Sequence, residues 1–221
     1  MASLGFDWLV VDMEHGAGDV HNATLAFIAA ERHGCTPMAR LPSADPFLGR
    51  RLLDAGACGL FVPVVESAEA FAEFAQHCLY PPLGRRGVGL GRVNRWGDDF
   101  EPYLRTFDPV LVPLVETRAG VTAADSIAAL PVVDALFLGP YDLSADLGVP
   151  GNFNDSSFCS AIDTVKAACA RHGKAAGFHQ VNPDPEDLRQ KVADGFRLIA
   201  YGTDIVAMRW ALGRPRDLLA D

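Results

Sequence analysis

The segment VLVPLVETRAGVTAADSIAALPVVDALFLGPYD, residues 110–142, decides the fold class of this chain. It contains two short apolar runs, VLVPLVET and DALFLGPYD, and each ends close to a carboxylate. Continuous apolar runs of this length are typical of strands that are buried on both faces of a parallel sheet. The runs begin about 25 residues apart, which is the spacing that a strand–helix–strand unit requires.

The same unit recurs along the whole sequence. Segments such as LAFIAAERHG and FCSAIDTVKAACARHG, which lie between apolar runs, carry apolar residues at helical spacing. Seven strands are therefore expected in a single domain, residues 1–221. Besides the two runs above, they are DWLVVDME from Asp7, TPMARLP from Thr36, GLFVPVVE from Gly59, KAAGFHQV from Lys174 and RLIAYGTD from Arg197.

Units of this kind build either a doubly wound sheet or a barrel. No GxGxxG follows the first strand, and GLGRVN lacks the last glycine, so a dinucleotide-binding fold has little support. The barrel is the expected fold. The Gly-rich stretch YPPLGRRGVGLGRVNRW, residues 80–96, is too polar to be core and is interpreted as an active-site or interface loop.

Composition excludes several classes of protein. The chain has 221 residues, of which 49% are hydrophobic, and a net charge of −9, which disfavours nucleic acid as a partner. The amino terminus lacks a basic region, and no apolar run is long enough to span a membrane. Five dispersed cysteines fit a reducing compartment, so a cytoplasmic protein is expected.

Two acids suggest a metal site. Glu116 and Asp142 close consecutive strands, and neighbouring strand ends of a barrel place side chains close together. Oxygen ligands without a partner cysteine suit Mg²⁺ or Mn²⁺. Gly139 and Pro140 form a turn whose amide groups could hold a carboxylate or an enolate oxygen. The alternatives are that both acids are ordinary strand-end caps and that Asp142 is a helix N-cap.

Three more polar residues follow strands. His15 lies three residues after Asp12, so a general base oriented by a carboxylate is one interpretation, and a solvated loop histidine is the other. Arg40 ends an apolar run, where its partner is either a substrate carboxylate or a neighbouring acid. The three lysines, Lys166, Lys174 and Lys191, are not placed to form a Schiff base, so carbonyl chemistry here would require a metal.

These residues lie in motifs that resemble the HpcH/HpaI aldolase family. The resemblance covers essentially the whole chain and rests on GFDWLVVDMEHG, ARLPSADP, LLDAGACGLFVPVV, YPPLGRRGVG, VETRAG, FLGPYDLSADLG and GTD. It implies a (β/α)8 TIM barrel of the phosphoenolpyruvate/pyruvate superfamily. It also implies an aldolase that uses Mg²⁺, Mn²⁺ or Co²⁺ to cleave 4-hydroxy-2-oxo acids to pyruvate, or another 2-oxo acid, and an aldehyde.

The resemblance also assigns roles to particular residues. Glu116 and Asp142 correspond to the metal ligands, His15 with Asp12 to the catalytic histidine and its orienting acid, and Arg40 to the substrate-carboxylate arginine. Gly139 and Pro140 complete the substrate site, and Asp54 corresponds to a catalytic-site position at its periphery. Leu114 stands where members often carry Gln, which makes the pocket less polar.

Further expectations follow from the same resemblance. Members usually have about 25 residues before the GFDW segment, so the barrel is expected to lack its first βα unit. Members commonly form hexamers, so a homo-oligomer such as a trimer of dimers is expected. A citrate-synthase-like condensing enzyme and a decayed or regulatory barrel are the alternative functions.

Overall fold

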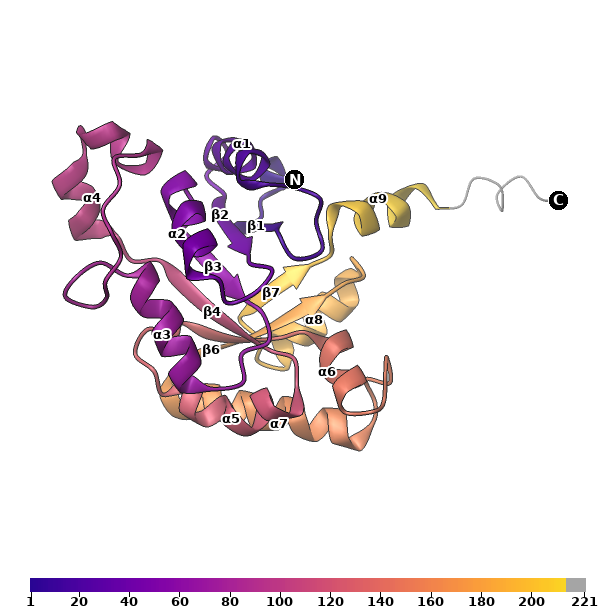
Figure 1. Ribbon diagram of the computed structural model, residues 1–221. Coiled ribbons are helices and arrows are strands. Elements are labelled where there is room, and N and C mark those ends of the chain that lie inside the picture. The colour runs from indigo at the N-terminus through magenta and orange to yellow at the C-terminus, as the bar shows by residue number, and fades with distance from the viewer. Residues whose placement is uncertain (214–221) are drawn as a thin grey trace.

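Seven parallel strands form one sheet in which the order in space follows the order in sequence. The computed structural model describes residues 1–213. All seven predicted strands are confirmed, and the sheet curls into a half-barrel (Figure 1). The strands are β1 Trp8–Asp12, β2 Thr36–Arg40, β3 Gly59–Val62, β4 Val110–Val115, β5 Ala135–Leu138, β6 Ala175–Gln180 and β7 Leu198–Tyr201.

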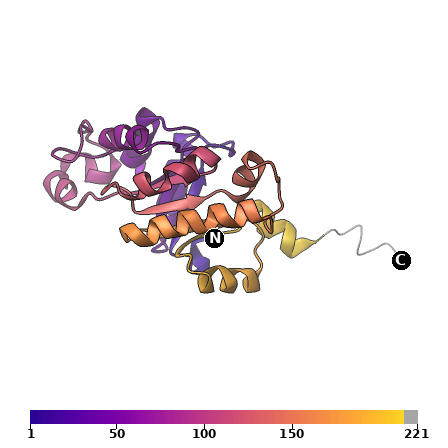
Figure 2. The same cartoon turned by 90° about the horizontal axis from the view of Figure 1, so that it is seen from below.

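Helices follow the strands and cover the convex face of the sheet. Most begin at an Asp, Ser or Thr whose side chain accepts a backbone N–H of the first turn, as Asp45 and Thr117 do. Helices α5 and α7 run side by side (Figure 2). The helices are α1 Val20–Glu31, α2 Pro46–Ala55, α3 Ala68–Cys78, α4 Phe100–Thr106, α5 Arg118–Ala128, α6 Pro140–Asp146, α7 Ser156–His172, α8 Pro185–Ala193 and α9 Asp204–Leu212, with 3-10 turns η1 Ala2–Leu4 and η2 Arg92–Gly97. None of the described helices has the length and apolar composition that crossing a bilayer requires.

Successive side chains of each strand point to opposite faces of the sheet, and this alternation creates two hydrophobic cores. Outward-facing side chains such as Leu60, Leu111 and Leu136 pack against the helices and are fully buried. Inward-facing side chains form a smaller cluster on the concave face of the sheet. There the rings of Trp8 and Phe61 stack with centroids 5.6 Å apart, and Phe61 meets Phe137 edge-on at 5.0 Å. This aromatic row lies beneath the carboxyl ends of the strands.

The sheet is open at one side. Among the described residues, β1 and β7 do not pair, and the residues of both strands are only partly buried. Helix α9, which follows β7, projects from the body in both ribbon views and has no buried side chain (Figures 1 and 2). Within residues 1–213 the chain is thus a half-barrel rather than a closed barrel.

The long Gly-rich loop lies at the opposite end from the expected site. It runs from the end of α3 to the start of β4, and therefore sits at the amino ends of the strands. Arg92 of this loop donates to Glu31 and to the carbonyl of Ala55, which lie at the ends of α1 and α2. The loop therefore does not border the active site of its own chain, and the prediction that it does is wrong. The alternative, that the loop forms an interface, stays a prediction.

The convex core should dominate stability. Phe71 of α3 is 1% exposed, whereas Phe47 of α2 is 64% exposed. We expect Phe71→Ala to lower the free energy of unfolding by about 3–5 kcal/mol, because the change removes apolar contacts and leaves a cavity. Phe47→Ala, the matched control, should cost less than about 1 kcal/mol. Urea denaturation followed by circular dichroism measures both changes, and equal losses would contradict this assignment of the core.

Candidate functional site

A cavity of about 670 Å³ opens at the carboxyl ends of the strands. Its aromatic floor is the row Trp8, Phe61 and Phe137, and it extends toward the open side between β1 and β7. The structure brings together eight of the nine residues predicted from the sequence. They are Asp12, His15, Arg40, Leu114, Glu116, Gly139, Pro140 and Asp142.

Glu116 is the most buried acid of the cavity. It follows β4, is 5% exposed, and its Oε2 accepts the backbone N–H of Val64 at 2.9 Å. Burial raises the pKa of Glu116, and the charges of Asp142 and Glu14 raise it further, against the lowering effect of the Val64 N–H. A carboxylate in this position favours a positively charged partner.

Asp142 enters from the neighbouring strand end. It lies in the first turn of α6, whose N-cap is Gly139, so the alternative that Asp142 itself caps the helix is wrong. A methyl group on Gly139 would come within 2.6 Å of Glu116 Oε1, so only a glycine lets the Glu116 side chain lie against this turn. Gly139 thus brings the Glu116 carboxylate up to the helix that carries Asp142.

Arg40 is held by acids of the same rim. Its Nε and Nη2 donate to the two carboxylate oxygens of Asp12 at 2.9 and 2.6 Å, and Nη1 lies 3.1 Å from Glu14. Burial alone would raise the pKa of Asp12, but this pairing and two backbone N–H groups lower it below its ordinary value. In this structure the partner of Arg40 is therefore a neighbouring acid, which was one of the two predicted alternatives. The Arg40 side chain is still 19% exposed.

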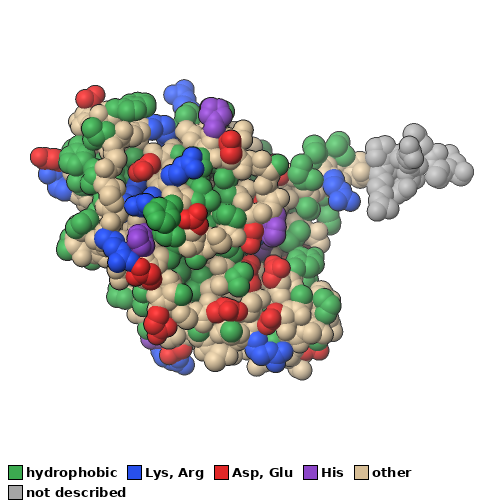
Figure 3. All heavy atoms as spheres, in the orientation of Figure 1, with side chains coloured by type: hydrophobic (Ala, Val, Ile, Leu, Met, Phe, Trp, Pro, Cys, Tyr) green, Lys and Arg blue, Asp and Glu red, His purple; other side chains and the backbone are tan. Residues whose placement is uncertain are grey.

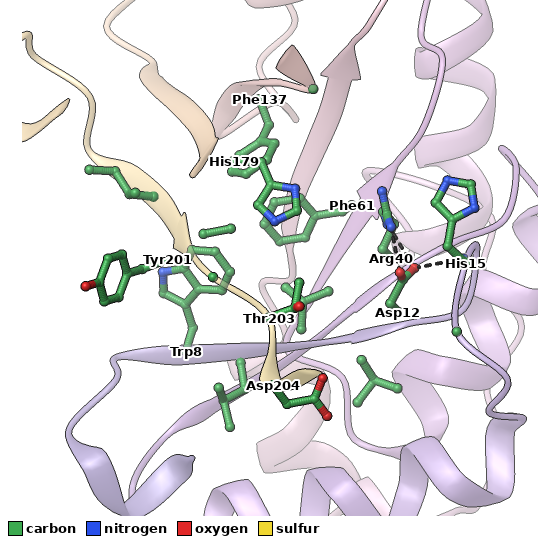
Figure 4. Close-up of a pocket in the computed structure, with 18 of the residues that line it drawn as sticks. Trp8, Asp12, His15, Arg40, Phe61, Phe137, His179, Tyr201, Thr203 and Asp204 are labelled. Atoms are coloured by element: carbon green, nitrogen blue, oxygen red, sulfur yellow. Dashed lines mark hydrogen bonds and ion pairs between the residues drawn. The ribbon is translucent and has the colours of Figure 1, made fainter. Parts of the chain in front are cut away.

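In this structure Asp12 does not contact the imidazole of His15, so the orienting role of Asp12 stays a prediction. Asp12 Oδ1 accepts the backbone N–H of His15 at 3.3 Å, because the chain turns sharply after β1, and its two oxygens are already engaged by Arg40. The His15 side chain is 69% exposed, and Glu14 is its nearest acid, at 3.9 Å. In Figure 4 the ring stands at the rim beside the Asp12–Arg40 pair.

Asp54 does not line the cavity of its own chain, and its role as a site residue stays a prediction. It lies in the last turn of α2, which runs antiparallel to the strands and ends at their amino side. There it pairs with Nη2 of Arg86 at 2.6 Å. The buried Arg86 guanidinium is also stacked between the rings of Tyr80 and Phe107.

His179 is a further cavity residue, outside the nine predicted from the sequence. It lies on β6, and its ring points into the cavity beside the rings of Phe61 and Phe137 (Figure 4). The adjacent Gln180 points outward instead, where its amide donates to the carbonyls of Asn182 and Asp184. Alternate residues of a strand share one face, and His179 shares the face of the inward-facing Ala175. This alternation could have identified His179 from the sequence.

The donor set fits a hard divalent cation. Glu116 and Asp142 offer carboxylate oxygens from adjacent strand ends, next to the Gly139 turn into which Glu116 is fitted. Within residues 1–213 no cluster of three or more His, Cys, Asp or Glu side chains forms a metal site. Water or substrate oxygens would complete the coordination of an ion held by these two acids.

Glu116 should make stability depend on pH. Its pKa in the folded protein lies above 4.5, its ordinary value, so the folded state keeps this proton longer than the unfolded chain. Its charged form then costs stability as pH rises through the folded pKa. We expect Glu116→Gln, which keeps an acceptor for Val64, to melt at a higher temperature than wild type near pH 8. This advantage should shrink toward pH 4.

Glu69→Gln is the matched control, because Glu69 is exposed on α3. Its melting temperature should stay close to wild type over the same pH range. A Glu116→Gln protein that melts below wild type at pH 8 would show that the buried charge is compensated within the chain itself.

The protein resembles known enzymes over nearly all of its length. A family model described as HpcH/HpaI aldolase/citrate lyase matches residues 1–211. A hydroxypyruvate/pyruvate aldolase of Chromohalobacter salexigens is 38% identical over 96% of this chain and 84% of that protein.

Solved structures show the same similarity. An HpcH/HpaI aldolase from Desulfitobacterium hafniense superposes with a TM-score of 0.89 and 29% identity, covering 99% of this chain and 85% of the other. The citrate synthase SbnG superposes with a TM-score of 0.83 and 26% identity, covering 99% and 84%. The half-barrel thus matches structures of this family along the whole described sheet. The chain belongs to the HpcH/HpaI aldolase/citrate lyase family and is a carbon–carbon lyase.

Proposed function

We propose that the chain is a divalent-metal-dependent aldolase that joins pyruvate to an aldehyde, and cleaves the resulting 4-hydroxy-2-oxo acid. The observation that carries this proposal is the convergence of Glu116, Asp142 and Arg40 around one cavity with an aromatic floor. The hydroxypyruvate/pyruvate aldolase similar to this chain supports the choice of substrate.

The charges of the cavity support a need for a cation. Four acids, Asp12, Glu14, Glu116 and Asp142, lie in or beside the cavity. Their charges act on one another and on Arg40. Arg40 is already paired with Asp12 and Glu14. An anionic 2-oxo acid entering this site would meet an excess of negative charge, which disfavours binding. A divalent ion such as Mg²⁺, Mn²⁺ or Co²⁺ would reverse that balance.

The residues of the chain then have distinct tasks. Glu116 and Asp142 would hold the ion, which supplies positive charge to polarise the keto group and stabilise the enolate. The Arg40 side chain and the Gly139–Pro140 turn are placed to bind the carboxylate of the substrate. Leu114 and Phe137 line the cavity with apolar surface and keep water away from the reacting carbon.

His15 is the proposed base. It takes a proton from the methyl group of pyruvate, either directly or through water, and leaves an enolate. The enolate carbon bonds to the aldehyde carbon, and the aldehyde oxygen takes up a proton to become the C4 hydroxyl. Cleavage runs through the same steps in reverse. None of the three lysines lines the cavity, so the Schiff-base route has no residue to carry it.

Two finer features of the assembly are also proposals. The open side between β1 and β7 is where an eighth strand would complete a (β/α)8 barrel. A homo-oligomer is proposed because α9 exposes Ile205, Met208, Trp210 and Leu212, and Figure 3 shows hydrophobic side chains over much of this arm. A second copy of the chain, with the same apolar helix, would bury that surface.

Condensation in the manner of a citrate synthase is a second candidate, favoured by the structural match to SbnG. The two reactions use different substrates. Oxaloacetate with acetyl-CoA would be consumed by a condensing enzyme, whereas pyruvate with an aldehyde would be consumed by the proposed aldolase. Side-by-side turnover of both pairs, with the same metal ion present, decides between them.

The metal proposal predicts proton exchange at pyruvate. With Mn²⁺, Mg²⁺ or Co²⁺, the protein should exchange the methyl protons of pyruvate with D₂O, as followed by NMR. Removing the metal with EDTA, or introducing Glu116→Ala or Asp142→Ala, should lower the rate by about 100-fold or more, because the enolate charge loses its counter-ion. Glu101→Ala, an exposed acid on α4, is the control and should exchange at the wild-type rate. Full exchange by a metal-free sample would refute the proposal.

Exchange of the pyruvate methyl protons should also depend on His15. We expect His15→Ala to slow pyruvate exchange by about 10²–10⁴-fold, as removal of a general base does, while Mn²⁺ affinity measured by calorimetry stays within about threefold. His33→Ala removes an exposed histidine at the opposite end of the strands and should leave the rate unchanged. Wild-type exchange in His15→Ala would assign the base to another group.

A further inference from the structure

We infer that His179 binds a hydroxyl group on the aldehyde acceptor, and that this contact makes the enzyme select hydroxylated aldehydes over apolar ones. This inference rests on the proposed aldolase function and names the acceptor class for the same cavity.

The position of His179 places it inside the substrate space. Its ring projects from β6 into the cavity, beside the rings of Phe61 and Phe137 (Figure 4). In the same view the Asp12–Arg40 pair separates it from the exposed His15. Within residues 1–213, neither ring nitrogen of His179 forms a hydrogen bond to another residue. The ring nitrogens are thus available to a ligand that enters the cavity.

The ring is suited to a neutral polar ligand. Burial lowers the pKa of His179, and the positive charge of Arg40 lowers it further, against smaller opposite effects of Asp12 and Asp142. The imidazole therefore stays neutral around pH 7, and one nitrogen donates while the other accepts. A hydroxyl group has the same dual capacity, so ring and hydroxyl can pair in either direction.

The order of the strands separates the acceptor from pyruvate. The groups proposed to hold pyruvate follow β2, β4 and β5, whereas His179 lies on β6. Beyond it, Thr203 and the ring of Trp8 line the same cavity toward the open side. His179 thus stands between the pyruvate groups and the remaining space, which is where the acceptor must lie to meet the enolate carbon.

The test compares two aldehydes of nearly equal size. Glycolaldehyde carries a hydroxyl where propanal carries a methyl group. We expect the ratio of kcat/KM for glycolaldehyde over propanal to fall by about tenfold in His179→Leu, the effect of losing one neutral hydrogen bond. The ratio cancels the intrinsic reactivity of each aldehyde and any general loss of enolate formation. His179→Asn, which keeps a donor and an acceptor, should retain most of the preference.

Controls separate this inference from the proposed function. His33→Leu should keep the wild-type ratio, and His179→Phe replaces His179→Leu if the latter does not fold. The role of His179 alone is overturned if the wild-type protein exchanges pyruvate protons and the glycolaldehyde-to-propanal ratio of kcat/KM in His179→Leu or His179→Phe stays within about twofold of wild type. Wild type that exchanges no pyruvate protons with any of the three metals overturns the proposed function itself.

Discussion

The site depends on one geometric constraint, the parallel alignment of seven strands in a curled sheet. Because every strand points the same way, the inward-facing residue at each carboxyl end reaches the same side of the half-barrel. Arg40, Glu116 and His179 come from strands that are far apart in sequence, yet they line one cavity. The aromatic row of Trp8, Phe61 and Phe137 supports that cavity from below, since the same alternation brings these rings inward.

The polar rim works against the stability that the core provides. Glu116 is buried beside other acids, and its raised pKa shows that the fold tolerates a charge it would be more stable without. Arg40 compensates only part of this negative charge, because its guanidinium is already paired with Asp12 and Glu14. Such arrangements are common where a ligand supplies the missing charge, and they exchange stability for function. The burial and clustering of these acids thus support the proposed cation more strongly than their spacing in the sequence does.

The sequence was sufficient for the strands and for the strand-end acids, because both follow from apolar runs and their ends. It was insufficient where a side chain's direction depends on local backbone geometry. Asp12 accepts the backbone N–H of His15 because of the turn after β1, which no spacing rule specifies. The sequence does not show that Asp54 lies away from the cavity of its own chain, because a helix that returns antiparallel to the strands carries its last turn to the other end of the sheet. His179 and Gln180 are adjacent, and only the register of β6 decides which enters the cavity.

The two histidines of the cavity differ in environment, and this difference fits two different tasks. His15 stands at the rim with a side chain that is 69% exposed, so water reaches its imidazole. Burial and the positive charge of Arg40 lower the pKa of His179 and favour its neutral form. A proton carrier benefits from solvent, whereas a hydrogen-bonding group is most selective where water is scarce. The same half-barrel supplies both environments, because residues after a strand reach its rim while alternate residues within a strand face its interior.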